Sequence, residues 1–272
     1  MVTVSISGGK DSAVLLDLAR RCFPDIEAVY VNTRLDFPEV RRFAMNTPNV
    51  TVLQPKMRFA EVIKEYGWCF PTKETACTIY YARKGSAWAI KRLQGLNGDG
   101  TQSKYRQSHY VKWAYLVDSP FKISDRCCSI MKEAPLEKYE KESGKHPMVG
   151  TMAVESERRR QAWLQTGCNN FDSKHPISKP LSFWTTQDIL RYIREYSLPI
   201  ASVYGDIVED DKGRLTTTGE QRTGCIMCPI GAYRDAVNRF QRMAISHPKL
   251  HEYCMDALGL GAFLDYVGVP RR

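Results

Sequence analysis

The chain begins with a short apolar strand pattern that leads directly into a glycine-containing turn and then into an apolar helical run. The strand covers residues 2–6, the helical run covers residues 13–22, and the turn between them reads Ser7, Gly8, Gly9, Lys10, Asp11, Ser12. Glycine lets the backbone approach an anion closely, and the free amides at a helix start attract negative charge. This order of elements predicts a phosphate-binding loop; the alternative is an ordinary turn between strand and helix.

Strand and helix patterns continue to alternate after this loop. Short apolar strands are expected at residues 26–31, 50–53 and 148–154, and helices at about 38–46, 59–66 and 76–93. Such alternation is typical of a doubly wound, mostly parallel α/β sheet, whose ligands bind at the carboxyl ends of the strands. The fold class predicted from the sequence is therefore α/β, with a C-terminal helical extension.

The domain organisation follows from the same patterns. Residues 1–205 are expected to form a nucleotide-binding α/β domain with a basic insertion near residues 83–126. Residues 206–272 are expected to add a hairpin and a helical extension, which carries a C-x-x-C pair and packs on the same core. No internal repeat or low-complexity linker separates these parts.

Composition limits the compartment and the partners. None of the 272 residues lies in an uninterrupted apolar run of membrane-spanning length, and residues 1–6 lead into the loop without a secretory leader pattern. We therefore expect a cytoplasmic protein without membrane contact, in which the nine cysteines are thiols or metal ligands. The formal net charge of +9 favours an anionic partner.

Positive charge is concentrated in residues 83–126, which hold nine Lys or Arg against three Asp. Four aromatic residues are interleaved with these cations: Tyr105, Tyr110, Trp113 and Tyr115. Cations for phosphates and aromatic rings for unstacked bases are what nucleic-acid binding requires. The segment predicts a nucleic-acid substrate, with a solvated basic surface as the alternative.

Four cysteines form the second strong pattern of the chain. Cys127 and Cys128 are adjacent, and Cys225 and Cys228 form the C-x-x-C pair. Two thiolate pairs can hold zinc or an iron–sulfur cluster. Adjacent cysteines are awkward ligands for one tetrahedral ion, whereas a cluster offers a separate iron to each sulfur. The adjacent pair thus favours an iron–sulfur cluster, with zinc or buried structural thiols as alternatives.

Several motifs together resemble one enzyme group. The turn S-G-G-K-D-S after the first strand resembles the pyrophosphatase loop of the adenine-nucleotide alpha-hydrolase superfamily. The stretch C-C-S-I-M-K-E-A-P-L from Cys127 resembles a segment of its cluster-containing adenylylsulfate and phosphoadenylylsulfate reductases. This resemblance implies a 4Fe-4S cluster held by Cys127, Cys128, Cys225 and Cys228. Asn32 and Thr33, followed by F-P-E, resemble the element near the adenosine in that family. Gly150 and the later E-S-x-x-R of Glu155, Ser156 and Arg159 resemble its phosphate-binding element.

The resemblance implies a chemistry for these residues. The Ser7–Ser12 loop would hold ATP or an adenylyl sulfate, with Mg²⁺ bridging the phosphates of ATP, and reaction would occur at the alpha phosphorus. Lys10, Asp11 and Arg159 are the expected catalytic residues, with Asn32, Thr33, Gly150, Glu155 and Ser156 contributing to nucleotide binding. A homodimer is expected from the same family.

The chain also departs from the reductase pattern. Reductases of this family carry their nucleophilic cysteine in a C-terminal E-C-G-L-H motif, and this chain has no such motif. Cys254 is the one cysteine at a plausible distance to act as the nucleophile instead. Met152 and Ala153 stand where the reductases carry paired arginines. The E-S-x-x-R motif is similar to that of the DNA-phosphorothioation branch of the superfamily. We expect an ATP-using enzyme that supports sulfur transfer from a donor protein to a nucleic acid. The alternatives are a reductase using Cys254 and a non-catalytic nucleotide or redox sensor.

Overall fold

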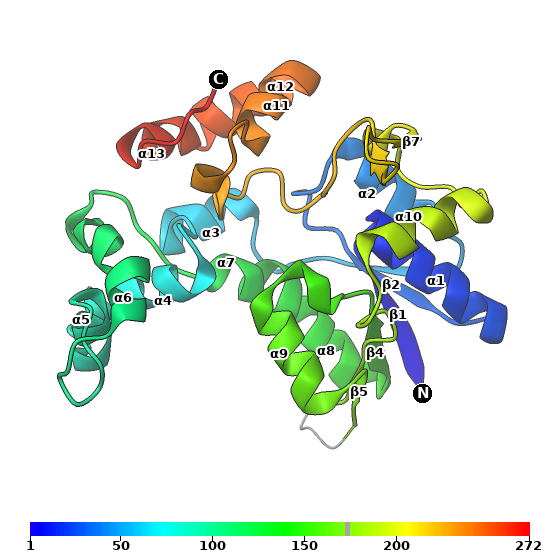
Figure 1. Cartoon of the computed structure of the whole chain (residues 1–272), viewed down its shortest axis with the longest axis horizontal. Coiled ribbons are helices and arrows are strands. Elements are labelled where there is room, and N and C mark those ends of the chain that lie inside the picture. Colours follow the sequence, from blue (N-terminus) through cyan, green and yellow to red (C-terminus); the bar gives the residue numbers. More distant parts are fainter. Residues whose placement is uncertain (172–174) are drawn as a thin grey trace. The chain divides into compact units, whose positions relative to one another are not determined.

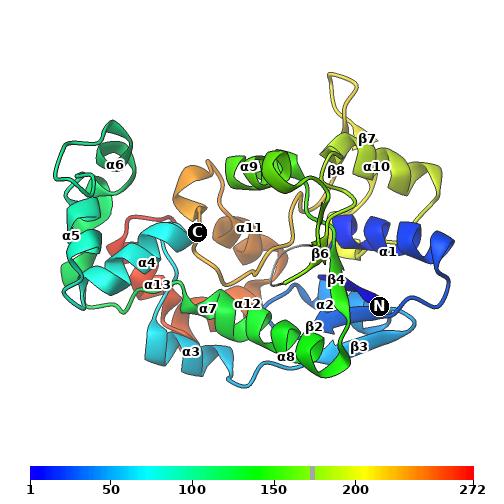
Figure 2. The same ribbon diagram turned by 90° about the horizontal axis from the view of Figure 1, so that it is seen from below.

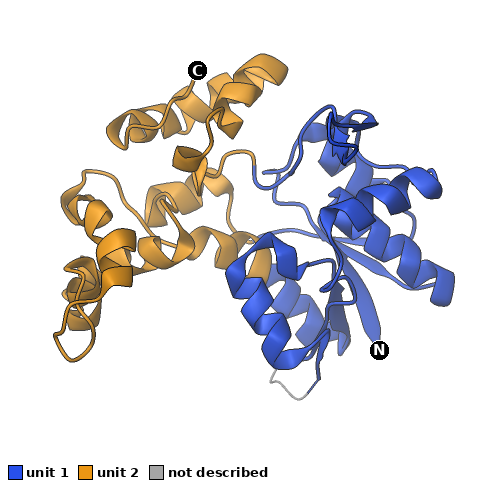
Figure 3. Ribbon diagram, in the orientation of Figure 1, with its two compact units in different colours: residues 1–55, 134–225 blue, residues 56–133, 226–272 orange. Residues whose placement is uncertain are grey.

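The computed structural model describes residues 1–171 and 175–272, which form two compact units. Unit 1 consists of residues 1–55 and 134–225, and unit 2 consists of residues 56–133 and 226–272 (Figure 3). Each unit is assembled from two separated stretches of chain. The division predicted at residue 205 stays a prediction.

Unit 1 is built on a six-stranded sheet with the order β3-β2-β1-β4-β6-β5 (Figure 1). Its strands are β1 (Val2–Ile6), β2 (Ala28–Val31), β3 (Val50–Leu53), β4 (His146–Val149), β5 (Asn169–Asn170) and β6 (Ile177–Ser178). All neighbouring pairs are parallel except β5 with β6. The predicted α/β fold with a mostly parallel sheet is confirmed. Because β2 lies on one side of β1 and β4 on the other, the strand order reverses at β1.

Helices of unit 1 pack around this sheet. They are α1 (Lys10–Cys22), α2 (Pro38–Met45), α8 (Ala134–Ser143), α9 (Glu157–Thr166) and α10 (Thr186–Glu195), with short 3₁₀ turns η3 (Ala153–Glu155) and η4 (Ser202–Tyr204). Figure 2 shows α1 and α10 side by side, and Tyr192 of α10 donates a 2.6 Å hydrogen bond to Asp17 of α1. Val14 and Leu15 of α1 are buried against strand residues such as Val4, because apolar side chains recur on the helix face toward the sheet. The expected hairpin is present as β7 (Ile207–Glu209) and β8 (Leu215–Thr217).

Unit 2 is helical. From its first stretch come α3 (Phe59–Tyr66), α4 (Lys73–Ala82), α5 (Ala87–Leu93), α6 (Lys104–His109), the 3₁₀ helix η1 (Val111–Asp118), α7 (Arg126–Cys128) and the π turn η2 (Ser129–Glu133). Its second stretch supplies η5 (Ala232–Arg234), α11 (Arg239–Ser246), α12 (Pro248–Glu252), the π turn η6 (Tyr253–Ala257) and α13 (Leu260–Tyr266). Among the described residues, no helix combines the length and the apolar character needed to cross a membrane.

Aromatic side chains join the two stretches of unit 2. Phe263 of α13 contacts Trp68, Phe70 and Phe121, with ring centroids 5.4 to 6.1 Å apart. Large aromatic rings bury much apolar surface and favour such edge and offset contacts. The C-terminal helices are therefore part of the core of unit 2.

The helix expected over residues 76–93 is wrong as a single element, because the chain breaks between α4 and α5. Gly85 adopts a left-handed backbone with φ of 78°, which ends a helix readily. Just before this break, Arg83 reaches the end of η1 and donates hydrogen bonds of 2.6 to 2.9 Å to backbone carbonyls. The acceptors are the carbonyls of Leu116, Val117, Ser119 and Phe121. Burial lowers the pKa of Arg83, but its guanidinium keeps its charge.

Replacing Arg83 is expected to destabilise unit 2. Arg83→Ala removes a charged donor from four backbone carbonyls, which we expect to lower the free energy of unfolding by about 2–4 kcal/mol. Urea unfolding followed by tryptophan fluorescence measures this change. Lys104→Ala is the control, because Lys104 is an exposed cation of the same basic segment, and it should change stability by less than about 0.5 kcal/mol. Equal effects of the two substitutions would contradict the structural role of Arg83.

Candidate functional site

The loop between β1 and α1 needs its first glycine. Gly8 has a left-handed backbone with φ of 74°, and a Cβ at this position would lie 2.6 Å from the carbonyl oxygen of Val40. Gly9 is extended and precedes the first residue of α1, Lys10. Any side chain at Gly8 would strain the backbone and collide with α2. The glycines therefore let the chain turn tightly from the sheet into the helix.

Hydroxyl groups order the same loop from within. The Ser12 hydroxyl donates a 2.9 Å hydrogen bond to the Gly9 carbonyl and accepts the Ser7 amide at 3.2 Å. The Ser7 hydroxyl accepts the Gly9 amide at 3.3 Å. These bonds fix the shape of the loop at the N-terminus of α1, and they engage the Ser7 and Gly9 amides with side-chain oxygens.

Two residues that the sequence analysis did not single out lie against this loop. The Lys10 amide donates a 3.1 Å hydrogen bond to the hydroxyl of Tyr204, which is 2.6 Å from the hydroxyl of Thr223. Burial raises the pKa of Tyr204, so its hydroxyl remains protonated. Because 194 residues separate Lys10 from Tyr204, no local sequence pattern identifies this contact.

Lys10 and Asp11 place opposite charges at the first turn of α1. The Lys10 ammonium lies 2.9 Å from a carboxylate oxygen of Asp11, and the Lys10 side chain is only 5% exposed while that of Asp11 is 27% exposed. A cation held among amides can neutralise phosphate charge, and a carboxylate beside it can bind Mg²⁺. Two of the three predicted catalytic residues, Lys10 and Asp11, are therefore in contact through their charged groups.

Gly150 brings β4 to the loop. β4 runs parallel to β1 with Ser5 opposite Val149, so Gly150 follows β4 at the edge where the loop follows β1. A Cβ at Gly150 would lie 3.1 Å from the carbonyl oxygen of Asp11, tighter than an ordinary contact. A glycine at this position allows the two strand ends to approach each other.

The rest of the predicted phosphate-binding element is organised around the start of α9. The Ser156 hydroxyl accepts the Arg159 amide at 3.3 Å and caps α9. Glu155 accepts the Met152 amide at 2.8 Å and forms an ion pair with Arg159. Of the predicted residues in this element, Gly150 contacts the loop, whereas Glu155 and Ser156 shape the local turn.

Asn32 and Thr33 lie at the same edge of the sheet. They follow β2, which runs parallel to β1, and both are buried. The Asn32 side-chain oxygen accepts a 2.9 Å hydrogen bond from Arg41, and the Thr33 hydroxyl accepts the Leu35 amide at 3.1 Å. Both side chains therefore order the turn after β2.

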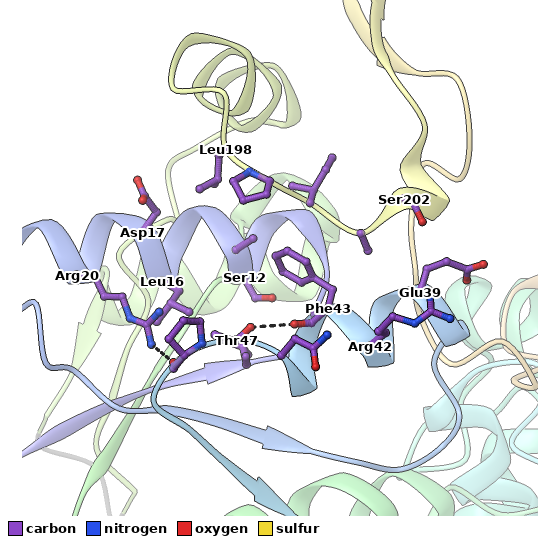
Figure 4. Close-up of a pocket in the computed structure, with 18 residues that line it drawn as sticks. Ser12, Leu16, Asp17, Arg20, Glu39, Arg42, Phe43, Thr47, Leu198 and Ser202 are labelled. Atoms are coloured by element: carbon purple, nitrogen blue, oxygen red, sulfur yellow. Dashed lines mark hydrogen bonds between the residues drawn. The ribbon is translucent and has the colours of Figure 1, made fainter.

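A hollow of about 470 Å³ opens between α1, α2 and residues 198–202 (Figure 4). Its lining is largely apolar and includes Leu16 and Phe43, while the guanidinium of Arg20 is bonded to the carbonyl of Pro48. This hollow reaches the loop at Gly8 and Ser12, and neither Lys10 nor Asp11 lines it. It is therefore separate from the charged pair.

The predicted metal ligands fall in both units. Cys127, Cys128 and Cys228 belong to unit 2, and Cys225 is the last residue of unit 1. In unit 2 the buried thiol of Cys69 is close to three of them. Burial raises the pKa of Cys69, and negative charge on Cys228, Cys128 and Cys127 raises it further.

Backbone hydrogen bonds account for the position of Cys69. The carbonyl of Trp68 accepts the Ser124 amide at 3.1 Å, in the stretch that leads to α7, and the carbonyl of Pro71 accepts the Gly231 amide at 3.2 Å. Residues 68–71 therefore lie between the chain that carries the Cys127–Cys128 pair and the chain that follows Cys228.

The thiols fit an iron–sulfur cluster by their chemistry, because thiolates are its usual ligands. Within residues 1–171 and 175–272, no three Cys, His, Asp or Glu side chains are grouped to hold a single metal ion. A cluster does not require such a group, since each sulfur binds a different iron.

Cys254 is fully buried in the π turn η6. Burial raises the pKa of its thiol to about 12, so the group is protonated near neutral pH. A thiol is a poor nucleophile compared with a thiolate. Its environment is that of a packing residue.

Most cations of the basic segment 83–126 have structural partners. Lys91, Arg106 and Lys122 donate to backbone carbonyls, as Arg83 does. Lys84, Arg92, Lys112 and Arg126 lie over aromatic rings. Tyr110 and Trp113 are buried, whereas Tyr105 and Tyr115 are exposed. These contacts contribute to the stability of unit 2, while Lys84, Lys104, Lys112, Lys122 and Arg126 remain exposed.

The Tyr204–Thr223 pair should stabilise the loop cooperatively. Tyr204→Phe removes the acceptor of the Lys10 amide and is expected to cost about 1–2 kcal/mol, and Thr223→Val about 1 kcal/mol. Because the two hydroxyls share a hydrogen bond, the double variant should lose less stability than the sum of the singles. Urea unfolding of the four proteins measures this coupling, and strict additivity would show that the bond contributes nothing.

Comparison with known proteins identifies similar chains. An uncharacterized protein of Methanocaldococcus jannaschii is 24% identical over 263 residues, which are 94% of this chain and 47% of that protein. The chain thus spans about half the length of this relative. A crystal structure of phosphoadenylyl-sulfate (PAPS) reductase from Candida auris, in a phosphate complex, is 17% identical with a TM-score of 0.42, covering 82% of this chain and 83% of that one.

The family comparison covers most of the chain. A model of the phosphoadenosine phosphosulfate reductase domain matches residues 1–89 and, in a second overlapping stretch, residues 72–230. These stretches contain β1, the glycine loop, Gly150 and both cysteine pairs. The chain belongs to the phosphoadenosine phosphosulfate reductase domain family.

Proposed function

We propose that the chain binds an adenine nucleotide through the Ser7–Ser12 loop and catalyses substitution at its alpha phosphate. The main observation in support of this proposal is the close approach of Gly150 to the backbone of Asp11. This approach brings the loop after β1 next to the end of β4, where the strand order reverses. Ligands of open α/β sheets bind at such a reversal. Family membership supports the adenine nucleotide as the ligand.

The residues have distinct roles in the proposed reaction. The loop amides and Lys10 hold the beta and gamma phosphates, and Asp11 holds a Mg²⁺ ion that supplies further positive charge. An acceptor atom forms a bond to the alpha phosphorus, and pyrophosphate leaves. Arg159, held by Glu155 at the start of α9, supplies the guanidinium of the phosphate-binding element.

ATP suits the site better than an adenylyl sulfate. Met152 and Ala153 are buried and apolar where the reductases carry arginines, so these two positions supply no charged donor to a sulfate. Cys254, the nucleophile that the reductase alternative requires, is buried and protonated. A nucleotide sensor would share the binding but not the release of pyrophosphate.

Sulfur transfer to a nucleic acid is the finer part of the proposal. Cys127, Cys128, Cys225 and Cys228 would hold a 4Fe-4S cluster, which supplies sulfur or electron chemistry when bound. The adenylylated acceptor is then open to attack by sulfide-level sulfur from a donor protein. The bond from the acceptor to the AMP oxygen breaks as the bond to sulfur forms, and AMP leaves. A homodimer remains part of this proposal.

Loss of Lys10 should weaken ATP binding. Lys10→Ala removes a buried cation from the loop, and we expect the Kd for Mg·ATP to rise about ten- to a hundredfold in calorimetry.

Asp11→Asn should suppress pyrophosphate release, measured with a coupled assay and an added acceptor. Cys254→Ser should leave ATP affinity and pyrophosphate release unchanged. If the chain instead releases sulfite from adenylyl sulfate with thioredoxin, and Cys254→Ser abolishes that release, the chain is a reductase.

The cluster is tested by metal analysis. Protein purified without oxygen should contain about four irons and four sulfides per chain. Cys127→Ser and Cys225→Ser should each lower the iron content and the visible absorbance. Cys77→Ser is the matched control, since Cys77 is a half-buried thiol of unit 2 beside Asp125, and it should retain the iron. A colourless protein with one zinc would overturn the cluster.

A further inference from the structure

A second hollow lies in unit 1 beside the start of α9. Its volume is about 450 Å³, within the range of sites that bind small molecules. Three cationic side chains line it, Arg158, Arg159 and Lys179, and no carboxylate does. The hydroxyl-bearing residues Thr151 and Ser156 also line it. The hollow is therefore positively charged, with apolar and polar groups in its wall.

Two of its cations are not neutralised by a carboxylate. Arg159 pairs with Glu155, but in the part of the chain that the structure describes no ion pair involves Arg158 or Lys179. Guanidinium and ammonium groups gathered at one hollow repel each other unless an anion joins them. Their hydrogen-bond donors match the oxygens of a phosphate ester.

An aromatic ring completes the wall. Trp163 lies one helical turn after Arg159 on α9 and is half-buried in the lining. No fully buried residue occurs in α9, so its side chains are accessible along the helix. An indole face beside cations is the combination on which a nucleobase stacks.

The hollow begins close to the phosphate loop. Thr151 lines it and follows Gly150, whose backbone packs on the Asp11 carbonyl. The Ala153 amide donates a 2.8 Å hydrogen bond to the Ser182 carbonyl and fixes the next part of the lining. A phosphate ester bound here therefore lies near the site proposed for the nucleotide.

We propose that this hollow binds one nucleotide unit of a single-stranded nucleic acid, the acceptor in the proposed reaction. Arg158 and Lys179 hold a backbone phosphate, and Trp163 stacks on the base. The strand is single because a paired base is not free to reach the indole. This inference rests on the proposed function, and it assigns the acceptor to unit 1 rather than to the basic segment 83–126.

Binding of a fluorescein-labelled ten-nucleotide single strand, as DNA and as RNA, tests the site by fluorescence polarisation on the full chain. Trp163→Leu should raise the Kd about tenfold. Arg158→Gln with Lys179→Gln should reduce the slope of log Kd against log salt by about one to two. The matched control is Trp88→Leu with Lys104→Gln, an exposed indole and cation of the basic segment, which should bind normally.

The outcomes separate this inference from the proposed function. Unchanged strand binding by Trp163→Leu, or loss of binding in the control variant, would overturn the assignment. An equal loss of ATP and strand affinity in Trp163→Leu would also overturn it, because the hollow would then belong to the ATP site. If Lys10→Ala leaves ATP affinity unchanged while Trp163→Leu weakens strand binding, the nucleotide site fails and this site stands. AMP and inorganic phosphate, as competitors, report whether base and phosphate are both required.

Discussion

The parallel pairing of β1 with both β2 and β4 is the constraint on which the candidate site depends. Parallel strands end at the same edge of a sheet, so the segments after β1, β2 and β4 meet there although they are far apart in sequence. Gly150 contributes by allowing its backbone to approach Asp11. Without that approach the start of α9 and its cations would lie farther from the loop.

Charge is used in two different ways in this molecule. In unit 2, Arg83 and several of its neighbours donate to backbone carbonyls or lie over aromatic rings, so this run of cations contributes to the packing of the unit. In unit 1, fewer cations line a hollow, and two of them pair with no described carboxylate. The local partners of each cation, rather than the density of cations in the sequence, decide where an anion is attracted.

Local features were predictable from the sequence, whereas features that depend on distant contacts were not. The glycine loop and the mostly parallel sheet follow from short patterns of apolar residues and glycine, and both are present. The split of the 76–93 helix depends on Gly85 within an otherwise helical pattern. Tyr204 and Thr223 could not be found, because only the folded chain brings their hydroxyls to Lys10. No sequence pattern predicts that residues 56–133 and 226–272 form one unit, because this unit depends on aromatic contacts between the two stretches, such as those of Phe263.

The hydroxyl pair beside the loop also restricts a cysteine. Thr223 stands two residues before Cys225, so the Cα atoms of these two residues lie at most about 7 Å apart. While the Thr223 hydroxyl remains bonded to the Tyr204 hydroxyl, this short link limits how far Cys225 can move relative to the phosphate loop. The mobility of the Cys225 thiol thus depends on contacts with the first turn of α1, more than two hundred residues earlier in the chain.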